Sequence, residues 1–458
     1  MQKVQSERSK MLGTMPLKRL IPQISVPIMI SMLVQALYNV VDSIFVAQYD
    51  ANALTAVSLA YPIQMLMIAV STGLGTGINS LISRRLGEKR SEEARVAAWN
   101  GIFLSAIGAL MFVVFGLFFT RSAFHAMTGD ATLQEMGTTY LSIVTTFCFG
   151  LFMAIVFERM TQSTGNTMLS MITQMVGAIT NIILDPIMIF GLLGCPEMGI
   201  AGAAIATVIG QFCSMLTGFV LNQTRNRELH LHLPEFRIHM PIIRDILAVG
   251  FPSMIMASIS SVMTLALNAI LTRYGNTPIS VLGIYFKLQS FVFMPVFGLS
   301  NGMVAILAYN FGARSRSRVY EGIRISLYYA LGLMAVGMLA FMLIPHPLMR
   351  LFEKGENMEM TLMGIPALRT ISLCFLPAAV GISLSTVFQS VGKGTYSLIV
   401  SLSRQLLVLL PSAWLLSEAF GTVSAVWWSF PIAELVSFVI SLLMYRRVNR
   451  KMLQPLEE

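Results

Sequence analysis

Two aspartates lie deep within long apolar stretches, where an ionised side chain is costly. Asp42 lies about 20 residues into the first stretch and Asp185 about 18 residues into the fifth. At a rise of about 1.5 Å per helical residue, both lie roughly 27–30 Å from the same side of a membrane. Ionisable residues inside a bilayer mark a functional site by default, so we expect the two carboxyl groups to meet.

Polar side chains surround both aspartates if the stretches are helical. Those that share a helical face or a height with them are Gln35, Tyr38, Asn39, Tyr140, Asn181 and Thr207. With the two aspartates they form the predicted ion-coupling and substrate-binding site. Two carboxylates in a medium of low dielectric cannot both be charged cheaply, so a proton is one expected ligand. A purely structural role, in which these groups only join helices, stays open.

Sodium is the alternative ion, because Na⁺ prefers hard oxygen ligands. Its predicted ligands are Asp42, Asn181, Asp185 and Thr207. Two prolines lie on the same helices: Pro27 within the first stretch and Pro186 directly after Asp185. Proline removes a backbone donor and bends a helix, so both are predicted conformational bends. Membrane helices also carry proline without a gating role.

The elements that position these residues must be membrane-spanning helices. Of the 458 residues, 55% are hydrophobic and 12% charged, and the mean hydropathy is +0.72, whereas soluble domains carry about 25% charged residues. Apolar stretches long enough to span a bilayer occur near 22–46, 54–83, 96–118, 134–158, 167–193, 199–221, 242–270, 278–308, 320–344, 362–388, 395–416 and 422–445. We therefore predict an all-α membrane protein with about twelve transmembrane helices.

The two halves of the sequence resemble each other. With a shift of 225 residues, Pro27 aligns with Pro252 and Gly87 with Gly312, and no gap is needed between them. Six spans per half make the repeats parallel, with a pseudo-two-fold axis along the membrane normal. The predicted lobes are residues 1–221 and 245–458, joined by a cytoplasmic linker at 222–244.

The aspartates have no counterpart in the second half, because Asp42 aligns with Leu267 and Asp185 with Ser412. Ion coupling is therefore expected in the first half only. The second half instead carries other ionisable residues within its spans, among them Lys287, Arg369, Arg404 and Glu434. Arg404 and Glu434 lie at compatible heights, and we predict a structural ion pair, with a substrate role as the alternative.

Basic residues predict the orientation of the chain. Most of the 31 lysines and arginines fall on one side, which places both termini in the cytoplasm. Topology and anionic headgroups then explain the net charge of +9 without nucleic acid. Neither a phosphate-binding loop, a catalytic triad nor a zinc motif is present, and the four cysteines lack metal-ligand spacing. We therefore expect no enzyme activity and no cofactor.

Four motifs resemble the multidrug and toxic compound extrusion (MATE) transporters, in particular their DinF-like or MepA-like branch. The motifs are Tyr38-Asn39-Val40-Val41-Asp42, Asn181-Ile182-Ile183-Leu184-Asp185-Pro186, Gly199-Ile200-Ala201-Gly202-Ala203-Ala204 and Tyr309-Asn310-Phe311-Gly312-Ala313. The resemblance implies a V-shaped pair of six-helix lobes and antiport of H⁺ or Na⁺ against organic cations. It also implies an ion site in the first lobe at Asp42, Asp185, Asn181, Tyr140 and Thr207. The stretch Ser258-Ile259-Ser260 lacks the glutamate of NorM-like relatives, which weakens the case for their type of sodium coupling.

The function predicted from these features is a secondary active transporter in the cell (inner or plasma) membrane. It exports cationic or amphipathic small molecules by H⁺ or Na⁺ antiport, with alternating access between the lobes, and acts as a monomer in the bilayer. Two alternatives stay open. One is a flippase for lipid-linked precursors, and the other is a membrane scaffold or receptor that transports nothing.

Overall fold

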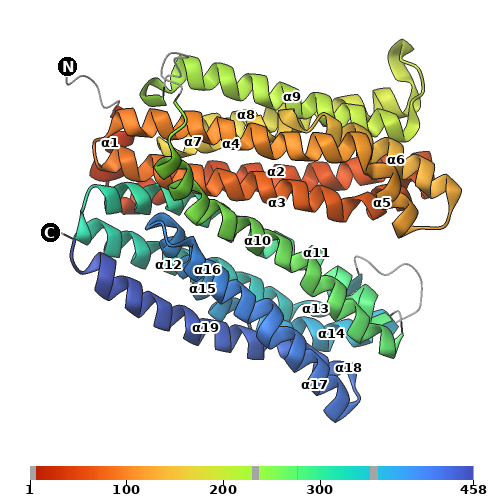
Figure 1. Ribbon diagram of the computed structural model, residues 1–458. Coiled ribbons are helices and arrows are strands. Elements are labelled where there is room, and N and C mark those ends of the chain that lie inside the picture. The colour runs from red at the N-terminus through yellow and green to blue at the C-terminus, as the bar shows by residue number, and fades with distance from the viewer. Residues whose placement is uncertain (1–6, 230–236, 276, 351–358, 457–458) are drawn as a thin grey trace.

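The computed structural model describes residues 7–229, 237–275, 277–350 and 359–456 (Figure 1). Within these ranges the chain is helical and contains no β-strand. Ten helices are long and apolar enough to cross a membrane, or up to twelve if each of two bent helix pairs counts as one span. The described part of the chain therefore confirms the prediction of an all-α membrane protein with about twelve spans.

In the described part of the first half, nine α-helices cover six predicted spans. They are α1 (Glu7–Thr14), α2 (Leu17–Tyr49), α3 (Ala51–Gly87), α4 (Ser91–Phe118), α5 (Thr120–Met127), α6 (Ala131–Thr146), α7 (Phe149–Ser163), α8 (Thr167–Phe190) and α9 (Gly199–Arg225). Short helices η1 (Leu192–Gly194) and η2 (Arg227–Leu229) follow α8 and α9. Of the predicted linker, 222–244, residues 230–236 lie outside the described ranges.

The second half begins with the long helix α10. Its helices are α10 (Met240–Leu271), α11 (Thr277–Gly312), α12 (Arg316–Leu343), α13 (Pro345–Arg350), α14 (Glu359–Ser372), α15 (Phe375–Ser390), α16 (Gly394–Leu402), α17 (Leu410–Phe420), α18 (Val423–Trp427) and α19 (Ser429–Val448). Short helices η4 (Thr272–Tyr274), η5 (Ser403–Leu409) and η6 (Asn449–Leu453) complete it, and η5 and η6 are π-helical.

Equivalent spans of the two halves are bent. Helices α6 and α7 meet at 45°, and α14 and α15 at 47°. Pro377 lies in the first turn of α15 and cannot donate a backbone hydrogen bond to the preceding helix. Cys148 and Cys374 occupy the same place, as the residue before the second helix of each pair. Hydropathy predicted these spans but not their bends.

Backbone irregularities also recur between the halves. Lys89 and Arg314, 225 positions apart, both have a positive φ, of 61° and 56°. Gly165 and Gly392 both have φ of 78°, in the turns before α8 and α16. Residues other than glycine rarely adopt a positive φ. Its recurrence at equivalent positions therefore indicates that the two halves have the same backbone conformation there, as the predicted parallel repeat requires.

The halves touch closely at the end of the molecule that carries α1 and the last turn of α19 (Figure 1). A Cβ atom added at Gly87 would lie 2.0 Å from the carbonyl oxygen of Tyr309, and one added at Gly312 would lie 2.2 Å from that of Arg84. These two contacts are mates under the 225-residue repeat. Glycine at both positions therefore lets the ends of α3 and α11 cross with their backbones in contact.

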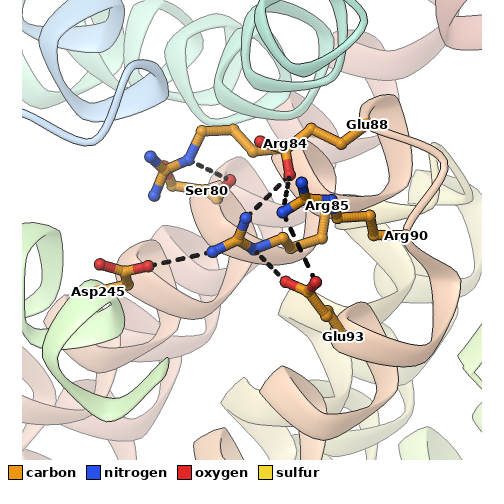
Figure 2. Close-up of polar contacts among 7 residues, drawn as sticks. All are labelled: Ser80, Arg84, Arg85, Glu88, Arg90, Glu93 and Asp245. Atoms are coloured by element: carbon orange, nitrogen blue, oxygen red, sulfur yellow. Dashed lines mark hydrogen bonds and ion pairs between the residues drawn. The ribbon is translucent and has the colours of Figure 1, made fainter. Parts of the chain in front are cut away.

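Polar contacts reinforce this junction. Figure 2 shows Arg85 of α3 between three acids, with Nη2 at 3.3 Å from Asp245 of α10, Nη1 at 2.8 Å from Glu88 and Nε at 3.3 Å from Glu93. The Ser80 hydroxyl donates to the carbonyl oxygen of Gln389 at 2.6 Å. Asp245 and Gln389 belong to the second half, so both of these contacts cross between the halves at this end.

Candidate functional site

Helices α2 and α8 bring the two aspartates together. Asp185 is fully buried, and its carboxyl group lies close enough to that of Asp42 for the two to share a hydrogen bond when one of them is protonated. The residues are 143 positions apart, yet equal height in two packed helices predicted their meeting. One oxygen of each, Asp42 Oδ1 and Asp185 Oδ2, is buried without a hydrogen-bond donor among the described residues.

Two deprotonated carboxylates cannot hydrogen-bond to each other, since each offers only acceptors. Buried charges of like sign are also strongly unfavourable in a low dielectric. One proton shared by Asp42 and Asp185, or one cation between them, would remove both problems. The arrangement is therefore suited to taking up and releasing a single positive charge.

Asn181 links this pair to α9. Its Nδ2 donates to Asp185 Oδ1 at 3.1 Å and to the Thr207 hydroxyl at 3.4 Å. Both Asn181 and Thr207 are buried, at 2% and 6% exposure. The approach depends on Gly210 of α9, where an added Cβ would lie 3.2 Å from the Asn181 Cβ and 2.8 Å from the carbonyl oxygen of Gly177. Small residues thus let α8 and α9 pack closely enough to align these groups.

Two tyrosines lie close enough to be within the electrostatic field of the aspartates. Tyr38 of α2 and Tyr140 of α6 both interact with the charges of Asp42 and Asp185, and Tyr140 is buried. The Tyr140 hydroxyl accepts a hydrogen bond from Gln64 Nε2 at 3.0 Å. Phenolic hydroxyls from two helices therefore complete the polar lining on this side.

The structure places two predicted residues elsewhere. Gln35 lies about two turns from Asp42 along α2, and its Oε1 accepts from Gln174 Nε2 of α8 at 2.8 Å. It therefore joins the same two helices without reaching the aspartates. The Asn39 side chain is exposed and makes no hydrogen bond with the described site residues. Asn39 precedes Asp42 by three residues and Tyr38 precedes it by four, so at about 100° per residue the two side chains lie on opposite sides of Asp42, and that of Asn39 lies on the outward side.

Sequence reasoning missed two glutamines. Gln64 on α3 bonds to Tyr140, and Gln174 on α8 bonds to Gln35. Both are amides within apolar stretches, which was a usable signal. Gln64 also aligns with Gln289 in the repeat, but that match indicated duplication, not a site.

The prolines do not break their helices. Helix α2 runs without interruption through Pro27, whose carbonyl oxygen accepts from the Ser31 hydroxyl at 2.9 Å. Helix α8 likewise continues past Pro186 to Phe190. Each proline still removes one backbone hydrogen bond from its helix, which lowers the cost of bending there.

Arg404 and Glu434 form the predicted contact in the second half. Arg404 Nη1, on the π-helical η5, donates to Glu434 Oε1 of α19 at 3.0 Å. The second carboxylate oxygen of Glu434 is buried without a donor among the described residues. Arg369 donates to the carbonyl oxygen of Met342 at 3.3 Å, and the side chain of Lys287 is exposed.

Within the described ranges, no group of three or more His, Cys, Asp or Glu residues lies together in an arrangement that could hold a metal ion. A sodium site at Asp42 and Asp185 would therefore rest on two carboxylates, completed by the amide of Asn181 and the hydroxyl of Thr207.

The fold and site define a polytopic helical membrane protein with a buried acidic pair in one of two repeated halves. The MatE family matches residues 27–187 and 252–415, two ranges that begin 225 residues apart as the internal repeat does. The chain therefore belongs to the MatE family, whose members are transporters and not enzymes.

Curated relatives cover almost the whole chain. Multidrug export protein MepA of Staphylococcus haemolyticus is 27% identical over 93% of both chains. MepA of Staphylococcus saprophyticus is 26% identical over 92% of this chain and 91% of its own length.

Solved structures share the fold. A structure described as MATE in complex with MaL6 has a TM-score of 0.91 and 26% identity, covering 98% of this chain and 99% of its own. A multidrug resistance MATE family transporter of the MOP superfamily in an outward-facing conformation has the same TM-score, identity and coverage. A MOP superfamily transporter from Pyrococcus furiosus, described as having a binding pocket of reverse polarity, scores 0.91 at 25% identity over 98% of this chain and 99% of its own.

Proposed function

We propose that the protein is a multidrug exporter that exchanges protons for cationic or amphipathic small molecules across the cell membrane. The observation that carries this proposal is the contact between Asp42 and Asp185, with one buried oxygen of each lacking a donor. A shared proton satisfies such a pair. The curated relatives support the substrate class, since those of the two staphylococci are multidrug export proteins.

The exchange follows from charge balance at the aspartates. When both are deprotonated, the site attracts an organic cation, because the low dielectric strengthens the interaction of opposite charges. A proton that enters from outside occupies one carboxyl group and weakens that attraction, so the drug leaves. Loss of the proton to the cytoplasm restores the site for the next cation.

Alternating access is the proposed route. The two halves are in contact at the end with α1, so this end would have to part for a drug to enter from the cytoplasm. Pro27 and Pro186 are the proposed bends that couple protonation to movement, because each lies on the helix of one aspartate. Cytoplasmic termini and a monomeric assembly in the cell membrane complete the proposal.

The first test replaces the carboxyl groups while keeping their size. Asp42→Asn and Asp185→Asn fix each position as neutral, and each should abolish export of a fluorescent cation driven by a pH gradient in proteoliposomes. Glu135→Gln is the matched control, since that acid is exposed at the start of α6 and should leave export unchanged. If both aspartate variants still concentrate the dye, the coupling role is wrong.

The second test identifies the ion. The same proteoliposomes are given an inward Na⁺ gradient at equal pH on both sides. Proton exchange predicts export with the pH gradient alone. Export with the Na⁺ gradient alone would assign the site to Na⁺. Movement of a fluorescent lipid without any dye export would instead favour a flippase.

A further inference from the structure

The N-terminal helix α1 is held at both ends by parts of the protein that come much later in the sequence. At its start, the backbone N–H of Ser9 donates to Glu228 Oε1 of η2 at 3.1 Å. At its end, Arg318 Nη2 of α12 donates to the carbonyl oxygens of Leu12 at 3.0 Å and Met15 at 2.9 Å. Helix ends leave such groups without partners, and here distant side chains provide them.

Asn310 completes the contact and gives a role to one of the sequence motifs. Its Nδ2 also donates to the Leu12 carbonyl oxygen at 2.9 Å, while its Oδ1 accepts from Arg318 Nε at 2.9 Å. Asn310 is 1% exposed and Leu12 is fully buried. Directly beside them, an added Cβ at Gly13 would lie 3.0 Å from the ring of Tyr309. The Tyr309-Asn310 dipeptide is thus the surface on which α1 rests.

The charges favour this arrangement. A carboxylate near a helix start and a cation near a helix end both interact favourably with the helix dipole. Glu228 occupies the first position and Arg318 the second. Glu228 is only 7% exposed, so the contact is shielded from water and from salt. An eight-residue helix is too short to be stable alone, so these contacts hold it in place.

The position of α1 connects it to opening and closing. It precedes α2 in the first half, and Gln23 Nε2 of α2 donates to Met11 Sδ at 3.8 Å, but its shorter hydrogen bonds with side chains of other elements are to η2 and to the second half. It lies at the end where Gly87 and Gly312 pack and where Arg85 meets Asp245. Parting the halves at this end would pull α1 away from either α2 or Arg318.

We propose that α1 is a latch that keeps this end of the transporter closed, and that Arg318 and Asn310 are the residues that fasten it. Release of Leu12 and Met15 from Arg318 would then be a required step before this end opens. The proposal extends the alternating access described above, and its first test needs neither a gradient nor a drug.

The first test measures opening by thiol labelling. The reporter is Ser25→Cys on α2, in a chain whose four native cysteines are replaced by alanine. Ser25 is 1% exposed and lies against Gly302 of α11, so it is covered only while the halves are together. Arg318→Gln should raise its rate of labelling by a soluble maleimide about tenfold or more, because a hydrogen bond from a charged group is worth at least one such factor.

Arg316→Gln is the matched control. Arg316 lies on the same helix and carries the same charge, but its guanidinium is 5.8 Å over the Tyr320 ring and not on α1. It should leave labelling unchanged. Equal labelling rates in the Arg318→Gln and Arg316→Gln proteins would overturn the proposal.

The second test locks the latch by a covalent cross-link and keeps the residues that fasten it, Arg318 and Asn310. Gly13→Cys and Tyr309→Cys are joined by a short reducible bifunctional reagent in the same background. Cross-linked protein should stop exporting dye, and reduction should restore export. Dye export at the uncross-linked rate would refute the latch. This arm also decides the matter if Arg318→Gln does not fold, while failure of the aspartate test would leave the labelling result standing.

Discussion

The geometry of the site in the first half depends on contacts between residues of neighbouring helices. Asn181 precedes Asp185 by one helical turn, so the sequence alone places the amide beside the carboxyl group. Its second contact, with Thr207, needs α9 to pack on α8 at the small residue Gly210. One amide thereby restrains both the acid and the neighbouring helix, which fixes the geometry into which a proton or a cation must fit.

Arg404 and Glu434 offer a residue-scale test of stability. Removing one partner leaves a charge in the interior, so Arg404→Leu or Glu434→Leu alone should lower the free energy of unfolding by about 3–5 kcal/mol. Replacing both should be much milder, because no charge is then left unpaired. Thermal unfolding of the two single variants and the double variant in detergent measures this. A double variant no more stable than the singles would show that the pair is not structural.

At the scale of elements, the repeat decides where the halves meet. Helices α3 and α11 cross with their backbones in contact. Gly87 of α3 packs against the carbonyl oxygen of Tyr309, and Gly312 of α11 packs against that of Arg84. The two contacts are therefore equivalent under the pseudo-two-fold repeat. Such an interface is tight because small residues allow it, and separable because few charged contacts cross it.

Substitution of these glycines should force the closed end apart. Gly87→Ala places a Cβ 2.0 Å from a backbone oxygen, which neither helix can avoid by a side-chain rotation. We expect faster labelling of the Ser25→Cys reporter and a lower melting temperature. Gly332→Ala on α12 is the control, since its Cβ would meet nothing within 4 Å and alanine favours the helix by up to about 1 kcal/mol. Identical behaviour of the two variants would contradict the role of the close approach.

In the whole molecule, the contacts between the halves and the acidic pair lie at different heights along the helices. The end with α1 carries the ion pairs of Arg85 and the contacts of Arg318. Asp42 of the acidic pair lies 25 residues along α2 from the start of that helix at Leu17. A closed end far from a buried acidic site is the arrangement expected of one state of an alternating-access carrier.

Orientation is tested in intact cells. The bias of basic residues predicts that both termini and the connection between the halves are cytoplasmic. Cysteines introduced by Gln2→Cys or Arg227→Cys into a chain whose four native cysteines are replaced by alanine should therefore resist an impermeant thiol reagent until the membrane is permeabilised. A chain that keeps only native Cys195, which is in the loop after α8 and partly exposed, should react from outside and is the control. Labelling of either introduced cysteine in sealed cells would reverse the assigned topology.

The sequence alone predicted the membrane spans, the repeat and the buried charged residues, because each of these is visible within one span or one helical turn. Hydropathy predicted the spans, since burial of some 20 apolar residues in lipid is independent of their neighbours. Identical spacing predicted the repeat. The cost of a charge in hydrocarbon singled out Asp42, Asp185, Arg404 and Glu434 before any contact was known.

Tertiary structure alone decided the contacts that join distant segments. Gln64 on Tyr140 and Arg318 on α1 depend on how helices rotate and cross, which no single helix encodes. The bends at Cys148 and Cys374 interrupt spans whose hydropathy is continuous. Asn39 was predicted in the site from its residue type, but its position on α2 leaves its side chain exposed. Residue type is set by the sequence, but the facing of helices is set by close packing of small residues at their crossings.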